Sequence, residues 1–78
     1  MNETEKAARR FAVCIQNQGY EASLERNKIY VVIPDADAAS EGDVRVVDES
    51  GEDYLYPSEW FVLMDVPKAV EASLLKAS

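Results

Sequence analysis

Carboxylates are the most closely spaced chemical groups in this sequence, and several oxygens in one loop could bind a hard cation such as Ca²⁺. Two groups of residues have loop-like spacing: Asp35, Asp37, Glu41 and Asp43, and Asp48, Ser50, Glu52 and Glu59. An EF-hand loop requires Gly at its sixth position, where these two groups place Ser40 and Asp53. The first group also has Ala39 where an oxygen ligand is needed. We therefore predict solvated turns and no metal site.

Catalytic chemistry has little support among these residues. The pairs Asp48-Glu49 and Glu52-Asp53 flank a tight turn, whereas paired catalytic carboxylates face each other across a substrate cleft. The chain has no His to activate a Ser or Cys nucleophile. Cys14 lies in an apolar strand-like segment, which favours a small buried side chain over a reactive thiol. We predict no catalytic residue, no cofactor and no enzymatic activity.

Aromatic residues alternate with aliphatic ones along two segments that are typical of β-strands, whose side chains point alternately to opposite faces. We expect the aliphatic members to face the core: Ile29, Val31, Ile33 and Leu55. The tyrosines between them then lie on the opposite side of their strands: Tyr30, Tyr54 and Tyr56. With Tyr20 and Trp60 they would form a partly exposed aromatic patch surrounded by acids, which is typical of a protein-binding surface. The alternative is that these rings pack beneath two terminal helices.

This interpretation gives a set of candidate binding residues, which are Tyr20, Tyr30, Glu52, Asp53, Tyr54, Tyr56, Pro57, Glu59 and Trp60. The acids in the set would steer a basic protein toward the rings. A rival interpretation is an acidic decoy that inhibits a nucleic-acid-binding protein. Another is a structural homodimer that forms through the C-terminal helix, whose apolar stripe contains Val70, Leu74 and Leu75.

Charge and composition set the limits for these hypotheses. The 78 residues include 15 Asp and Glu against 8 Lys and Arg, for a net charge of −7. Residues 30–65 contain ten acids and one base, Arg45, and such a field repels phosphate backbones, so we expect no direct binding to nucleic acid. The single Cys indicates a reducing compartment, and the longest apolar run, residues 60–64, is too short to span a bilayer. We expect a cytoplasmic protein without a membrane segment.

The hydrophobic pattern predicts five short strands, which lie at residues 11–15, 28–33, 43–48, 53–56 and 60–66. Val44 and Val46 point inward in the third strand. Asp35 is the expected N-cap of a single helical turn that ends near Gly42. Pro67 fits the first position of a C-terminal helix that reaches about Lys76. Short strands with frequent turns and no room for parallel crossovers favour a small antiparallel barrel.

The segment GEDYLYPSEWFV, residues 51–62, resembles the end of an SH3 domain, where a strand runs into Pro-Ser, a 3₁₀ turn and an aromatic-Val strand. The run CIQNQGYEASLERNKIYVVIPD resembles the long arm and second strand of such barrels. Together, GYEASLE and DESGEDYLYP are similar to segments of a family of short, uncharacterised bacterial proteins with SH3-like folds. The resemblance implies an all-β, five-stranded antiparallel SH3-like barrel at residues 11–66. A tail or short helical turn at 1–10 precedes it, and a helix at 67–78 follows.

The resemblance also implies a binding function, because SH3 domains bind proline-rich peptides in a groove of aromatic side chains closed by the Pro of the 3₁₀ region. In this sequence the matching positions are Pro57 and either Trp60 or Phe61. The paired Trp residues that begin the middle strand of those domains are absent, since Asp-Val-Arg-Val occupies residues 43–46. The partner expected from the sequence is therefore a protein, basic in character, that binds to an acidic aromatic surface.

Overall fold

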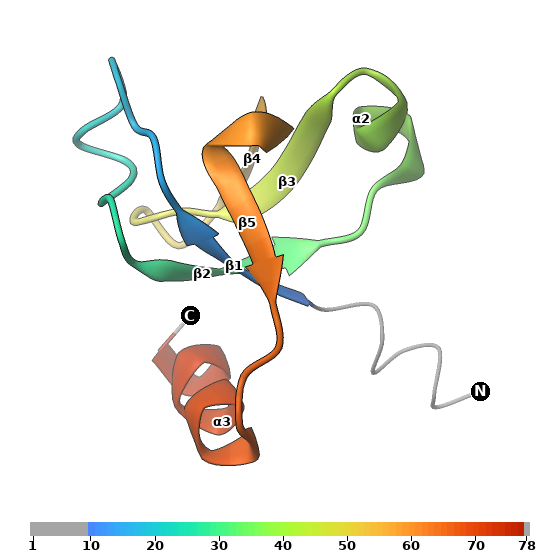
Figure 1. Ribbon diagram of the computed structural model, residues 1–78. Helices are drawn as coiled ribbons and strands as arrows, with labels where there is room; N and C mark the ends of the chain where they lie inside the picture. The colour runs from blue at the N-terminus through green and yellow to red at the C-terminus, as the bar shows by residue number, and fades with distance from the viewer. Residues whose placement is uncertain (1–9, 78) are drawn as a thin grey trace.

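The computed structural model describes residues 10–77, which form one antiparallel β-sheet with two α-helices and a 3₁₀ helix (Figure 1). The elements are β1 (Arg10–Cys14), β2 (Ile29–Ile33), α2 (Ala36–Ser40), β3 (Asp43–Val47), β4 (Asp53–Pro57), η1 (Ser58–Trp60), β5 (Phe61–Met64) and α3 (Lys68–Ala77). The five strands and the C-terminal helix were predicted to within two residues at each end. The predicted N-terminal helical turn lies outside the described residues, apart from Arg10, which begins β1.

The sheet has the strand order β4-β3-β2-β1-β5, and all neighbouring strands are antiparallel. Between β4 and β5 the chain turns through η1, so these two strands lie at opposite ends of the sheet. The Ser58 N–H donates to Gly42 O (2.9 Å), and the Ile15 N–H donates to Trp60 O (2.8 Å). Among the described residues β4 and β5 are not paired, so the barrel predicted from the sequence is not closed.

The core lies on the inner face of the curved sheet. Its buried residues are Ala12, Cys14, Leu24, Tyr30, Val32, Val46, Tyr56 and Phe61, with Val44 and Trp60 packed against them. The inward orientation of Val44 and Val46 is confirmed, as is the burial of Cys14. The orientation predicted for the second and fourth strands is wrong. Tyr30 and Tyr56 point into the core, and Leu55 is 45% exposed.

The error in the second strand has a physical cause, because both of its faces are apolar and both are covered. On the outer face, Val31 pairs with Val47 of β3, and Leu74 of α3 lines a cavity with these two residues and Ile29. Figure 1 shows α3 below β2, on the side away from α2. Period-two alternation therefore separates the two faces of β2 without telling which one forms the core. Of the three helix residues predicted to form a dimer interface, Leu74 instead faces β2 and β3 of its own chain.

The link between β2 and β3 forms as the sequence predicts. Asp35 is the N-cap of α2, and its Oδ1 accepts a 3.0 Å hydrogen bond from the Ala38 N–H. Gly42 has φ 81°, which an L side chain rarely adopts, and it ends the turn before β3. Asp35 Oδ2 also accepts from Arg45 Nε of β3 (2.8 Å). Asp35 thus anchors both the helix and the strand that follows it.

Candidate functional site

The longest loop in the described part of the chain, residues 15–28 between β1 and β2, is here called the arm. Its first half is held by turns in which the Ser23 and Leu24 N–H groups both donate to Tyr20 O (2.9 Å each). Asn17 Nδ2 donates to Leu24 O at 2.9 Å and closes the loop on itself. The Leu24 side chain is completely buried in the core. These contacts fix the backbone that carries Tyr20.

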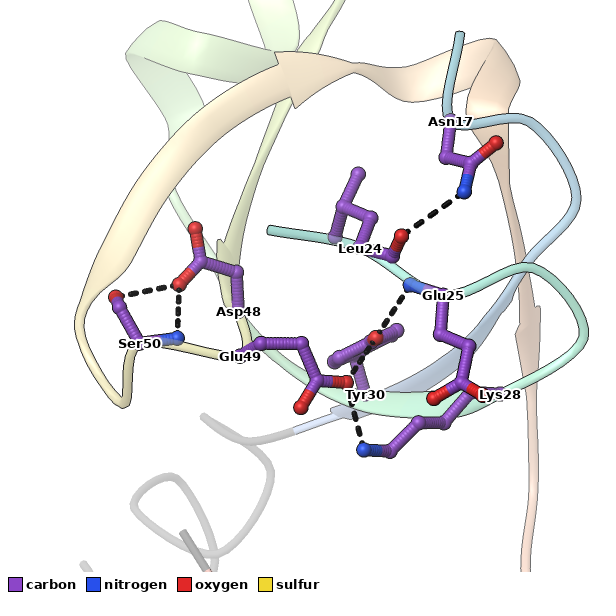
Figure 2. A network of polar contacts seen from close by, with 8 residues as sticks. All are labelled: Asn17, Leu24, Glu25, Lys28, Tyr30, Asp48, Glu49 and Ser50. Atoms are coloured by element: carbon purple, nitrogen blue, oxygen red, sulfur yellow. Dashed lines mark hydrogen bonds and ion pairs between the residues drawn. The ribbon is translucent and has the colours of Figure 1, made fainter. Parts of the chain in front are cut away.

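A polar network joins the arm to the β3–β4 turn, residues 48–52 (Figure 2). The Tyr30 hydroxyl lies at its centre: it accepts from the Glu25 N–H (2.7 Å) and donates to Glu49 Oε2 (2.5 Å). Lys28 Nζ donates to the same carboxylate oxygen at 2.6 Å. The Glu49 N–H donates to Ser23 O (2.9 Å). The sheet therefore positions the arm through both its backbone and its side chains.

Asp48 organises the other side of the turn. Its Oδ1 accepts from the Ser50 N–H (2.9 Å) and hydroxyl (2.6 Å), and its Oδ2 accepts from the Tyr56 hydroxyl (2.6 Å). Burial of Asp48 favours a higher pKa, but the hydrogen bonds from Ser50 and Tyr56 outweigh it, and the pKa of this carboxyl lies below its usual value. Burial and the bond to Asp48 raise the pKa of Tyr56 to about 12. Both groups keep their ordinary charge states at neutral pH.

Three aromatic rings from separate elements meet above this turn. The ring of Tyr20 on the arm lies 5.5 Å from that of Tyr56 and 5.6 Å from that of Trp60, edge to face in both cases. Tyr56 and Trp60 are stacked at 6.4 Å. Tyr56 is buried, Trp60 is half-buried and Tyr20 is 50% exposed. The cluster is therefore anchored in the core and ends in a ring that faces solvent.

A surface cavity of about 460 Å³ lies beside this cluster. It is lined by Tyr20, Ser23, Asp48, Ser50, Tyr54, Leu55 and Tyr56. Tyr54 and Leu55 are 49% and 45% exposed, so its rim is apolar and accessible, while the Asp48 carboxylate lies deeper. We call the exposed part of this region the aromatic rim, and define it as Tyr20, Tyr54, Leu55 and Trp60.

The structure separates the candidate binding residues predicted from the sequence into two groups. Tyr30 and Tyr56 are 5% and 4% exposed, so their rings belong to the core and are not available to a partner. The others reach the surface at least in part, and they are Tyr20, Glu52, Asp53, Tyr54, Pro57, Glu59 and Trp60. Pro57 and Trp60 are half-buried. Asp53 accepts from Arg45 Nη1 (2.9 Å), which partly neutralises it.

Sequence reasoning missed the inward direction of the two tyrosines and the exposure of Leu55. The signal that could have shown it is the pair Asp48-Glu49 in the turn after β3. A buried Tyr needs an acceptor for its hydroxyl at the edge of the core, and each of these carboxylates provides one.

The described residues hold neither a metal-binding cluster nor a membrane-spanning helix. Within residues 10–77 no group of three or more His, Cys, Asp or Glu side chains is arranged to hold a metal ion. In the same range, no helix has the length and apolar character needed to cross a membrane. Cys14 is buried, and its thiol donates to Gln16 O (3.2 Å). Comparisons with protein-family models, with curated proteins and with solved structures found no match to this chain.

Proposed function

We propose that this protein is a non-enzymatic interaction module that binds a basic segment of another protein on the aromatic rim. The observation that carries this proposal is the exposure of Tyr20 and Tyr54, at 50% and 49%, beside a cavity of about 460 Å³ with a carboxylate in its wall. Exposed rings that gather beside one cavity, rather than singly over the surface, are typical of a binding surface.

The charges around the rim favour a cationic ligand. Glu52 and Glu59 are exposed, and Glu52 accepts a hydrogen bond from the Tyr54 hydroxyl (3.1 Å). An Arg or Lys side chain that enters the cavity would contact the ring faces through cation–π interactions and approach the Asp48 carboxylate. The acidic field, which arises from a net charge of −7, would accelerate the encounter with a basic protein.

The SH3-like resemblance supports the same function. The structure has the two features on which that resemblance was based, a long arm between β1 and β2 and a 3₁₀ helix before β5. The positions carried over from the resemblance are Pro57, the N-cap of η1, and either Trp60, the last residue of η1, or Phe61, which follows it; Trp60 contacts Tyr20. We infer an open SH3-like sheet that acts in the bacterial cytoplasm, where its one free cysteine would stay reduced.

The test begins with capture of partners from bacterial lysate on the immobilised protein, followed by calorimetry with each purified candidate. Tyr20→Ala combined with Tyr54→Ala removes the two most exposed rings and should weaken binding about tenfold or more, because interface rings commonly contribute over 1 kcal/mol each. Glu41→Gln is the matched control, since Glu41 is an exposed acid at the end of α2, and it should leave affinity nearly unchanged. Equal affinities for the wild type and the double variant would contradict the proposal.

Salt dependence separates this function from that of an acidic decoy. Binding on the aromatic rim depends in large part on apolar contact, so affinity should fall only modestly as salt rises. A decoy that imitates a phosphate backbone would lose affinity steeply with salt and would be displaced by DNA. Competition by DNA together with a steep salt slope would favour the decoy instead.

A further inference from the structure

β5 forms one edge of the sheet, and its register with β1 shows which backbone groups face outward. The Ile15 N–H donates to Trp60 O, and Val13 lies opposite Val62. In an antiparallel ladder the hydrogen-bonded pairs alternate, so Trp60, Val62 and Met64 bond to β1. The N–H and C=O of Leu63 therefore point away from the sheet.

The side chains of β5 are apolar and unusually exposed on both faces of the sheet. Val62, Leu63 and Met64 are 49%, 56% and 39% exposed, and Ile15, diagonal to Val62 on the same face, is 45% exposed. The other edge differs, because β4 carries Asp53 and Pro57, residues that discourage strand pairing at an edge. β5 has neither a charge nor a proline between Phe61 and Met64. An edge of this kind is a template for another strand.

We propose that β5 pairs antiparallel with β5 of a second copy of this chain, around a two-fold axis at Leu63. Each Leu63 N–H then donates to the Leu63 C=O of the second copy, and Asp65 N–H donates to Phe61 C=O at either end. Val62 of one copy lies opposite Met64 of the other on the outer face. All three exposed side chains of β5 gain an apolar neighbour, and the two sheets become continuous.

The residues flanking β5 favour a second copy over a foreign strand. The chain before β5 carries Glu59, and the chain after Met64 carries Asp65 before it reaches Lys68, which begins α3. Antiparallel self-pairing around Leu63 sets Asp65 of one copy opposite Phe61 of the other and brings the Glu59 end toward the Lys68 end, whereas parallel pairing would place like charges together. Residues 60–64 carry no carboxylate, so only the flanking Glu59 and Asp65 would attract a basic peptide to this edge. α3 packs below β2 and does not pair with the free edge.

The test is sedimentation equilibrium of the full chain over a concentration series, combined with hydrogen exchange of the Leu63 amide. The wild type should form dimers, and the Leu63 amide should become protected as the concentration rises. Leu63→Pro removes an N–H that the monomer does not use and should abolish the dimer while the circular dichroism spectrum is retained. Val62→Pro, one residue away, removes a bond to β1 and should unfold the chain.

Two further variants keep the result interpretable. Leu63→Lys retains the N–H but places two cations face to face, so it should also give monomers if Leu63→Pro does not fold. Val70→Ser alters an exposed large apolar residue of α3 and should leave the dimer intact. Dimers that survive both Leu63 changes but are lost in Val70→Ser would place the interface on α3 and overturn the proposal. A wild type that remains at 8.7 kDa throughout, with an unprotected Leu63 amide, would also overturn it.

Salt provides a readout that separates this interface from the aromatic rim. Each copy carries a net charge of −7, so association must overcome mutual repulsion that salt screens. The dimer should therefore tighten as salt rises, whereas binding of a basic partner should weaken. Dimerisation through β5 leaves Tyr20 and Tyr54 exposed, so the two proposals can fail independently.

Discussion

The hydroxyl of Tyr56 donates a 2.6 Å hydrogen bond to Asp48 Oδ2, and both residues are buried, at 4% and 6% exposure. Asp48 follows β3 and Tyr56 lies near the end of β4, so this bond spans the hairpin from its turn to its far end. The ring of Tyr56 supports Tyr20 and Trp60 of the aromatic rim. The stability of the hairpin and the position of the rim therefore depend on one buried acceptor.

Tyr56→Phe should lower the free energy of unfolding by about 1–3 kcal/mol, because Asp48 would keep a buried oxygen without its donor. Urea denaturation followed by circular dichroism measures the change. Tyr54→Phe is the matched control, since the Tyr54 hydroxyl bonds to Glu52 at the surface, and it should change stability by less than about 0.5 kcal/mol. Equal effects of the two substitutions would show that the buried bond has no special role.

Acid should destabilise the protein in a defined range. Hydrogen bonds from Ala38 to Asp35, and from Lys28 and Tyr30 to Glu49, hold the pKa values of these two carboxyls below the unfolded values of 3.8 and 4.5. The unfolded chain then binds protons first, so stability is full above about pH 5 and falls as the pH drops through the folded-state pKa values. Urea midpoints measured across this range check the prediction. Glu49→Gln should reduce the slope of the urea midpoint against pH. An unchanged slope would show that Glu49 does not contribute to the acid sensitivity.

Alkali should also destabilise the protein, through the two buried phenols. Burial, together with the bonds to Glu49 and Asp48, raises the pKa of Tyr30 above 10.0 and that of Tyr56 to about 12. The unfolded chain loses these protons near 10.0, so their contribution to stability is full below that pH and disappears as the pH rises through the folded-state values. Phenolate absorbance should show these two tyrosines ionising only with unfolding. The double variant Tyr30→Phe with Tyr56→Phe lacks both buried hydroxyls, so the rise in phenolate absorbance that accompanies unfolding should disappear.

The order of the elements could be predicted from local chemistry, because each boundary has a strong signal. Asp35 caps α2, Pro34 ends β2 and Gly42 adopts the positive φ that ends the following turn. The direction of the side chains could not be predicted in the same way. β2 is apolar on both faces, and only the position of α3 decides which face is the outer one.

The candidate site was also predicted only in part, because local signals show which residues are polar but not which way the side chains of a strand point. The acids around the turn and the exposed Tyr20 follow from polarity and from loop position, whereas the exposure of Tyr54 was predicted from an alternation in β4 that is wrong for Leu55 and Tyr56. Leu55 was assigned to the core because it is aliphatic, yet the register places it opposite Arg45, on the face away from Val46 and Tyr56. Whether the rings of Tyr30 and Tyr56 are exposed depends on tertiary acceptors, Glu49 and Asp48; the sequence shows these two acids in the turn, but not that they accept from the two hydroxyls.

Leu24 should be the residue that attaches the arm to the core. Its side chain is fully buried, so Leu24→Ala should lower the free energy of unfolding by about 2–5 kcal/mol and increase hydrogen exchange in residues 15–28. Leu55→Ala removes the same atoms from an exposed position and should cost less than about 0.5 kcal/mol. If the two changes cost the same, the arm is not anchored by Leu24.

Asp35 combines two roles that two substitutions can separate. Its Oδ1 caps α2, and its Oδ2 bonds to Arg45. Asn is as good an N-cap as Asp, so Asp35→Asn should remove only the charge of the pair, whereas Asp35→Ala removes both contacts. The urea midpoint should therefore fall in the order wild type, Asn variant, Ala variant. Added salt should narrow the gap between wild type and the Asn variant, because it screens the ion pair, and should leave the gap between the two variants unchanged. If salt instead leaves the gap between wild type and the Asn variant unchanged, the ion pair with Arg45 contributes little, and Asp35 acts mainly as the N-cap of α2.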